Sequence, residues 1–104
     1  MTSAKNTALA YMYRDASNYK WSHTIVLEGT IRRENIQNYL IDGEFFLPRD
    51  IGLKCLTPYP RTEDDHDWHT IRSFTATTKP ADFCSADDFI NRFRHQYEKS
   101  WKYA

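Results

Sequence analysis

The C-terminal stretch SADDFINRFRHQYEKSWKYA constrains the fold more than any other part of the chain. Ser85 is a favourable helix N-cap residue, and Asp88 three positions later gives the pattern of a capping box. Apolar residues recur at spacings of three and four along the segment, at Phe89, Ile90, Phe93, Tyr97 and Trp101. The stretch therefore predicts an amphipathic C-terminal helix with one apolar face, which we expect to pack on a sheet.

Three other segments have the composition of β-strands. Residues 8–14 are apolar on both alternating faces, which is typical of a central strand packed on each side. Residues 23–29 follow after a short turn-forming segment, which predicts an antiparallel hairpin. Residues 68–78 are rich in threonine and aromatic residues and form the third predicted strand. The sequence thus predicts an α+β fold with an antiparallel sheet of three or more strands and the C-terminal amphipathic helix on one face.

The middle of the chain is predicted to contain a helix and then a packed loop. Thr30 is a candidate cap for a helix over residues 31–41, and Gly43 stands where a left-handed residue ends a helix. Residues 44–61 lose this period but remain rich in apolar residues, so we expect them to be packed against the core. An alternative fold is a mixed sheet in which part of residues 44–56 adds an edge strand.

The length and charge of the chain limit its function. The 104 residues suffice for a single α+β domain over residues 1–104. The 14 basic and 14 acidic residues cancel, so neither nucleic acid nor a membrane surface is expected as a partner. No run reaches the ~20 apolar residues that span a bilayer, and two cysteines are too few for a disulfide framework. These features predict a cytoplasmic protein.

Aromatic residues make up 15% of the chain, which is more than a small core readily buries. Tyrosine and tryptophan are common in protein interfaces. We therefore expect a small non-enzymatic module that binds a protein partner or forms a homodimer, and no cofactor. The predicted binding residues lie in the turn after the first strand and in the loop after the first helix: Asp15, Asn18, Tyr19, Trp21, Phe45 and Phe46.

The acidic segment EDDHDWH offers the main alternative. Carboxylate and imidazole groups are ligands for divalent metals, and Asp65, His66, Asp67 and His69 supply both. Such a site would suit a small metal-binding protein or a metal-dependent hydrolase. Residues three apart at the start of a strand point to opposite faces, however, so the two histidines are expected to diverge. The competing interpretation is a solvated loop anchored in the core by Trp68.

Cys84 directly precedes the predicted helix cap. A thiol at a helix N-terminus can have a lowered pKa and act as a nucleophile. Such a role needs a histidine base brought near it by the fold, and no local pattern supplies one. The more common alternative is a cysteine packed as a small apolar group.

Three stretches together resemble a group of small uncharacterised bacterial proteins of about this length, and the resemblance spans most of the chain. The stretches are YRDASNYK, beginning at Tyr13, DGEFFLP, beginning at Asp42, and DHDWH, beginning at Asp65. The resemblance implies a prokaryotic, single-domain, cytoplasmic protein. It implies no activity and no site residues.

Overall fold

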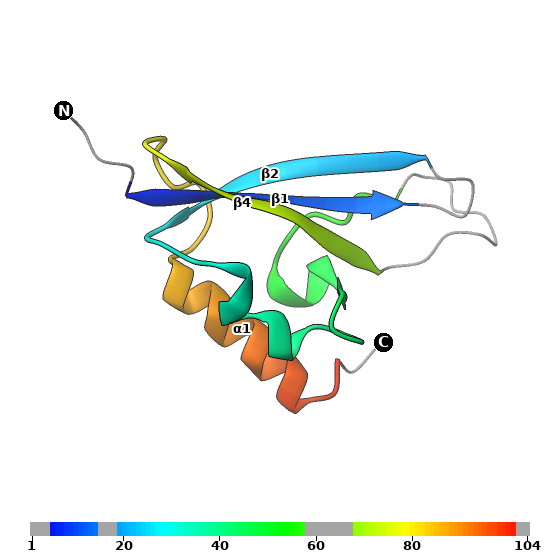
Figure 1. Ribbon diagram of the computed structural model, residues 1–104. Coiled ribbons are helices and arrows are strands. Elements are labelled where there is room, and N and C mark those ends of the chain that lie inside the picture. Colours follow the sequence, from blue (N-terminus) through cyan, green and yellow to red (C-terminus); the bar gives the residue numbers. More distant parts are fainter. Residues whose placement is uncertain (1–4, 15–18, 58–67, 102–104) are drawn as a thin grey trace.

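The computed structural model describes residues 5–14, 19–57 and 68–101 (Figure 1). Four antiparallel strands form one sheet in the spatial order β2-β1-β4-β3, and one α-helix packs on one of its faces. The strands and the helix are β1 (Asn6–Arg14), β2 (Lys20–Glu28), β3 (Phe45–Phe46), β4 (His69–Thr77) and α1 (Ala86–Glu98). Three short 3-10 turns complete the described part: η1 (Arg33–Asn35), η2 (Gln37–Tyr39) and η3 (Pro48–Ile51). The predicted α+β fold with an antiparallel sheet is confirmed.

The central strand β1 has one face in the core. Leu9, Tyr11 and Tyr13 are completely buried beneath the helical layer, whereas the alternating side chains from Ala8 to Met12 are only half-buried. In the described part of the chain, α1 and the 3-10 turns all lie on the same side of the sheet (Figure 1). The expectation that β1 is covered on both sides was therefore wrong for these residues, although its central position was right.

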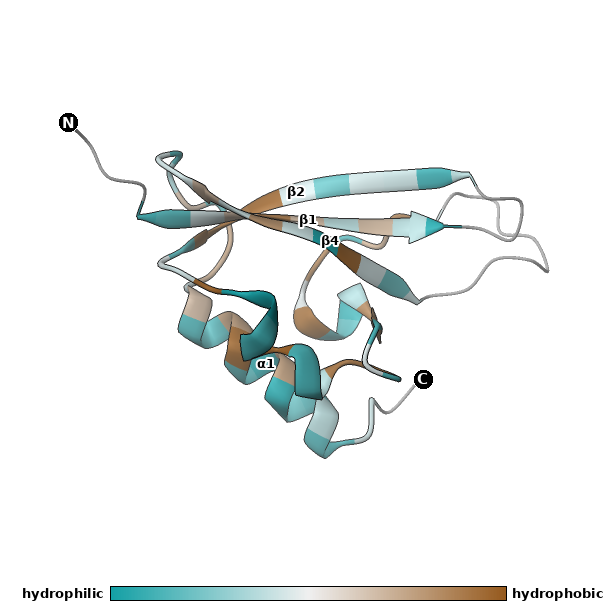
Figure 2. Cartoon of the chain, in the orientation of Figure 1, coloured by the Kyte–Doolittle hydropathy of each residue, from teal (hydrophilic) through white to brown (hydrophobic). Residues whose placement is uncertain are grey.

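Helix α1 begins as the sequence predicts and ends earlier. The Ser85 Oγ atom accepts a hydrogen bond from the Asp88 N–H at 3.1 Å. Phe89 and Phe93 are completely buried, and hydrophobic and hydrophilic residues intersperse along the helix (Figure 2). The helix stops at Glu98 because Ser100 and Trp101 adopt positive φ angles of 57° and 46°.

Trp101 returns to the core after this reversal of the chain. Its ring lies 5.6 Å from that of Phe93, and its Nε1 atom donates a hydrogen bond to the Tyr39 carbonyl at 2.7 Å. The sequence pattern correctly placed Trp101 against the helix core, but a left-handed turn brings it there instead of a further helical turn.

The predicted helix over residues 31–41 was wrong. The segment forms the separate turns η1 and η2, and Ile36, between them, has a φ of −123°. The first turn starts after Arg32 instead of Thr30, since the Asn35 side chain accepts a hydrogen bond from the Arg32 N–H at 2.8 Å. Asparagine side chains that bond to nearby backbone compete with helix formation. Gly43 is left-handed as predicted, with a φ of 70°.

The loop after Gly43 is packed, as predicted, over the part that the structure describes. Leu47, Ile51 and Leu53 are buried, and β3 adds a short edge strand in which Phe45 pairs with Thr70. The alternative with an extra edge strand was therefore right about the strand. That strand is antiparallel to β4, so the sheet is not mixed.

The Tyr11 hydroxyl gives this core a predicted alkaline sensitivity. The hydroxyl donates a hydrogen bond to the Lys54 carbonyl at 2.6 Å, and burial raises the pKa of Tyr11 to about 12. Because this pKa lies above the unfolded value, the stabilisation is complete below pH 10 and is lost as the pH rises from about 10 to about 12. Urea denaturation across this range should therefore show a steeper fall in the free energy of unfolding for the wild type than for Tyr11→Phe. Equal slopes for the two proteins would contradict the prediction.

Candidate functional site

The face of the sheet opposite α1 is built from small uncharged side chains. The register places Ala10 of β1 between Thr24 of β2 and Ser73 of β4, and it places Met12 between Ser22 and Thr70. We call the following residues the open face: Ala8, Ala10, Met12, Ser22, Thr24, Thr70, Ser73 and Thr75. None of these eight residues carries a charge, and five of them carry a hydroxyl group.

Charged residues mark the border of the open face. At one end Arg14 lies directly opposite Lys20, and at the other Glu28 lies opposite Asn6. Arg72, the exposed extra residue at the bulge between β1 and β4, lies midway along β4 next to Ser73 and is not at either end. The open face is therefore a patch of uncharged side chains with charged residues beside it.

The pair of cations at this border should destabilise the sheet. Like charges directly opposite on neighbouring strands repel, by roughly 0.2–1 kcal/mol. We predict that Lys20→Glu raises the free energy of unfolding by about 0.5 kcal/mol, because it converts repulsion from Arg14 into attraction. Lys79→Glu is the matched control, since it makes the same charge change at another exposed residue. Urea denaturation at low salt should show the gain for Lys20→Glu alone, and equal effects of the two substitutions would refute the pairwise explanation.

A hollow beside the open face has a mixed lining, in which the aromatic residues Phe45 and Trp68 lie with the charged residues Arg14, Arg33 and Glu44. The rings of Phe45 and Trp68 lie 5.1 Å apart, and Met12 and Thr70 of the open face line the same hollow. Arg33 is held at its side, because its Nη2 atom donates a hydrogen bond to the Ile71 carbonyl at 2.6 Å. We call this feature the aromatic hollow. It gives the uncharged patch an aromatic border on the side of β3.

The predicted binding residues of the first turn lie elsewhere. Tyr19 is 68% exposed, and its ring lies 6.5 Å from that of Trp21. Trp21 packs on Tyr13, so it projects toward the α1 side of the sheet. Asp15 and Asn18 are outside the described residues. Among the predicted residues of this turn that the structure describes, Tyr19 is exposed and Trp21 is half-buried.

The other predicted binding residues occupy the opposite edge. Phe45 lines the aromatic hollow, whereas Phe46 is completely buried between Tyr11 and Phe93. Among the described residues, Trp21 lies on the outer strand β2 and Phe45 on the outer strand β3, at opposite edges of the sheet. Sequence reasoning missed the contribution of Met12 and the open face. The signal was the row of small residues at alternate positions of β1, a pattern that fits a buried face as well as an exposed one.

The metal hypothesis rests on one residue that the structure describes. His69 is completely buried, and its Nε2 atom accepts a hydrogen bond from the Leu56 N–H at 3.0 Å. Asp65, His66 and Asp67 are outside the described residues. Within the described ranges, no group of histidine, cysteine and acidic residues is arranged to hold a metal ion. The metal site stays a prediction, and calorimetric titration with zinc, nickel and manganese tests it.

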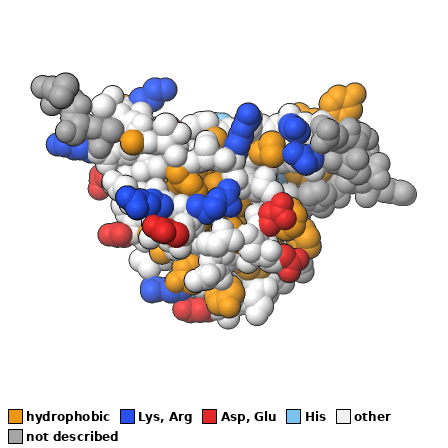
Figure 3. Space-filling view, in the orientation of Figure 1, with side chains coloured by type: hydrophobic (Ala, Val, Ile, Leu, Met, Phe, Trp, Pro, Cys, Tyr) orange, Lys and Arg blue, Asp and Glu red, His pale blue; other side chains and the backbone are white. Residues whose placement is uncertain are grey.

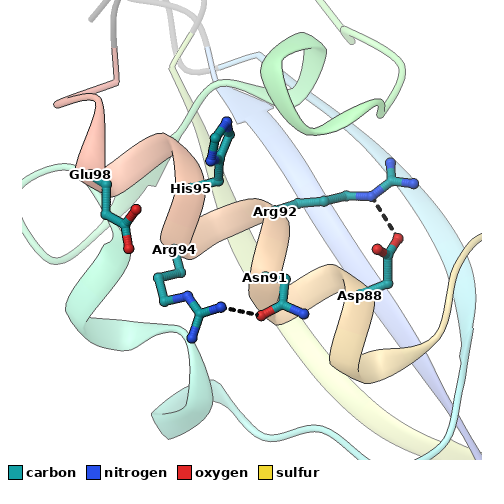
Figure 4. A pocket seen from close by; sticks show the side chains of 6 residues that line it. All are labelled: Asp88, Asn91, Arg92, Arg94, His95 and Glu98. Carbon is teal, nitrogen blue, oxygen red and sulfur yellow. Dashed lines mark hydrogen bonds and ion pairs between the residues drawn. The ribbon is translucent and has the colours of Figure 1, made fainter.

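The basic residues of α1 are engaged within the protein. Arg92 forms an ion pair with Asp88 at 2.9 Å, and Arg94 donates a hydrogen bond to Asn91 at 2.8 Å (Figure 4). Arg92 also donates to the Ile51 carbonyl and lies over the ring of Phe83. Both basic and acidic side chains occur on the visible surface (Figure 3). This mixed distribution gives no continuous basic surface for nucleic acid on that side of the molecule.

The surroundings of Cys84 disfavour the thiolate form that a cysteine nucleophile requires. Burial raises the pKa of its thiol to about 11, the Arg92 charge lowers it, and Asp88 raises it again. Little thiolate therefore exists at neutral pH. We predict that iodoacetamide modifies Cys84 more slowly in the folded protein than in urea, with Cys84→Ser used to subtract the reaction of Cys55. Faster modification in the folded state would revive the nucleophile hypothesis.

None of the helices in the described ranges is long and apolar enough to cross a lipid bilayer. Comparison of the chain with protein-family models, curated proteins and solved structures finds no match.

Proposed function

We propose that this protein is a small non-enzymatic module that binds a protein partner or a second copy of itself. The observation that carries the proposal is the open face, an uncharged sheet surface that the described elements leave uncovered. The resemblance of three stretches to bacterial proteins supports placing the module in a prokaryotic cytoplasm.

The composition of the open face supports a macromolecular partner. The centres of protein interfaces are depleted of charged residues and enriched in aromatic residues and methionine. Met12 lies in the open face, and Phe45 and Trp68 border it in the aromatic hollow. Covering this surface would remove apolar area from water at about 25 cal/mol per Å² before the cost of association is subtracted.

A charge placed in the middle of the open face tests the proposal. Ala10 is central in β1, and we expect Ala10→Lys to weaken self-association or partner binding at least about tenfold, because the interface would have to bury an unpaired ammonium group. Asn91→Lys is the matched control, since it adds the same charge on the exposed side of α1.

The measurements are analytical ultracentrifugation for self-association and quantitative comparison of captured bacterial proteins for partner binding. A loss of association in Ala10→Lys alone supports the open face as the interface. If the wild type stays monomeric and captures the same proteins as Ala10→Lys, the proposal fails.

A further inference from the structure

The outer edge of β2 is closed at one end and open at the other. The Val26 N–H donates a hydrogen bond to Asp82 Oδ1 at 2.8 Å, and the Val26 carbonyl accepts one from the Asp82 N–H at 3.0 Å. Backbone groups of an antiparallel strand alternate between its two edges. The N–H and C=O groups of Ser22 and Thr24 therefore point to the same outer edge as those of Val26. In the described part of the chain, no backbone or side-chain group bonds to them there.

The open portion of this edge has one of the features that protect edge strands, the exposed Lys20 at its start. Protective features are bulges, prolines, charged side chains and covering loops. The pairing of β2 with β1 is regular along its whole length, and no proline occurs in it. The segment that bonds to Val26 and Glu28 ends the free portion, so the exposed edge runs from Lys20 to Thr24. A strand of about five residues fits this length.

The charges beside this edge specify an acidic occupant. Arg14 and Lys20 are exposed, lie directly opposite each other and project toward the open face. Within the described ranges the ion pairs are made by Arg32 and Arg92 and include neither of these residues. A carboxylate on an incoming strand would convert their mutual repulsion into two attractive interactions.

We propose that the β2 edge from Lys20 to Thr24 binds an extended acidic peptide segment of a partner protein as an antiparallel fifth strand. The inference rests on the proposed function, because it specifies how a protein partner docks. Directly opposed residues of an antiparallel pair project to the same face. The peptide residues whose N–H groups meet Lys20, Ser22 and Thr24 therefore carry their side chains on the open face, and an acidic residue belongs opposite Lys20, beside the two cations.

Synthetic peptides test both the hydrogen bonds and the charge. The probe is a short capped peptide of alternating glutamate and valine, titrated into the full-length protein by calorimetry. N-methylation of the glutamates should weaken binding about tenfold or more, because these residues face β2, whereas N-methylation of the valines should leave the affinity unchanged. Glutamine in place of glutamate should also weaken binding about tenfold. No binding of the probe, or equal affinity for the two N-methylated forms, would overturn the proposal.

Variants of the protein give a second measurement. Ser22→Pro removes one outward-facing N–H and leaves the hydrogen bonds between β1 and β2 intact. It should therefore weaken binding of the probe about tenfold, whereas Ser22→Thr should leave the affinity unchanged. Lys20→Glu should likewise weaken binding of the acidic probe. If Ser22→Pro does not fold, the N-methylated peptides still decide the matter.

The two proposals fail in different ways. Ala10→Lys changes the open face and leaves the hydrogen-bonding groups of the edge intact, so the effect of N-methylation on probe binding by this variant reports on the edge. Binding that needs Ser22 and Lys20 but tolerates Ala10→Lys supports the fifth strand even if the open face is not an interface. If Ala10→Lys abolishes association and the probe does not bind, the open face is still supported as the interface and the fifth strand is rejected.

Discussion

Replacement of Phe93 by alanine is expected to lower the free energy of unfolding by about 3–5 kcal/mol. Phe93 is completely buried in α1 and joins three parts of the core, since its ring lies 5.0 Å from Phe89, 5.6 Å from Phe46 and 5.6 Å from Trp101. Its removal leaves a cavity between the helix, the edge strand and the C-terminal turn. A domain of this size has a total stability of roughly 5–15 kcal/mol, so the loss is a large fraction of it.

Urea denaturation followed by circular dichroism measures this loss, and a thermal scan should show a fall in melting temperature of about 4–8 °C for each kcal/mol. Tyr97→Ala is the control, because Tyr97 lies one helical turn further along α1 and is 52% exposed. The control should cost less than about 1 kcal/mol. Similar losses in the two variants would mean that α1 does not pack on the sheet through Phe93.

Replacement of His69 by alanine is expected to lower the free energy of unfolding by about 3–4 kcal/mol. The imidazole is completely buried, with its ring 5.3 Å from Tyr13 and 6.0 Å from Tyr11. It also accepts the hydrogen bond from the Leu56 N–H, which would be left unpaired. The cost therefore combines a cavity with an unsatisfied backbone donor.

His95→Ala provides the matched control for the same measurement, since His95 is exposed on α1. We expect it to change stability by less than about 0.5 kcal/mol. A His69→Ala variant as stable as His95→Ala would show that the imidazole is dispensable for folding. That result would return His69 to consideration as a ligand in the acidic segment.

The elements that the sequence predicted well are those whose signals are local. The start of α1 depends on Ser85 and Asp88, which are close in sequence, and the hairpin of β1 and β2 depends on two strand patterns separated by a short turn. Each is specified by neighbouring residues, so one sequence suffices. The packed loop after Gly43 was predictable for a different reason, namely the cost of leaving its many apolar residues in water.

The failure over residues 31–41 has an identifiable physical cause. The side chains there form contacts that a continuous helix would not allow. Arg33 reaches the Ile71 carbonyl, Gln37 bonds to Gly43, and Asn35 closes its own turn. Helix propensity is weak enough for such tertiary contacts to override it. A periodic pattern of apolar residues records which side chains are buried and does not record how the backbone turns between them.

The candidate site was less predictable than the fold because it depends on register. The open face forms only when Ala10 is aligned with Thr24 and Ser73, and the cation pair forms only when Arg14 faces Lys20. Neither alignment follows from composition or spacing. The burial of His69 likewise depends on the distant residues Tyr11 and Leu56, whereas the local sequence shows only its acidic neighbours.

The position of β1 between β2 and β4 also determines the order of folding. Its partner β2 begins six positions after β1 ends, but its partner β4 is distant in the sequence, since Asn6 pairs with Thr77, 71 positions later. Closing so long a loop costs entropy before native contacts offset it. The β1–β2 hairpin should therefore form early. The edge of β1 that pairs with β4 then stays unpaired until β4 is in place. During synthesis that edge is a second, transient template for strand addition, and it is the point at which the nascent chain is most exposed to aggregation.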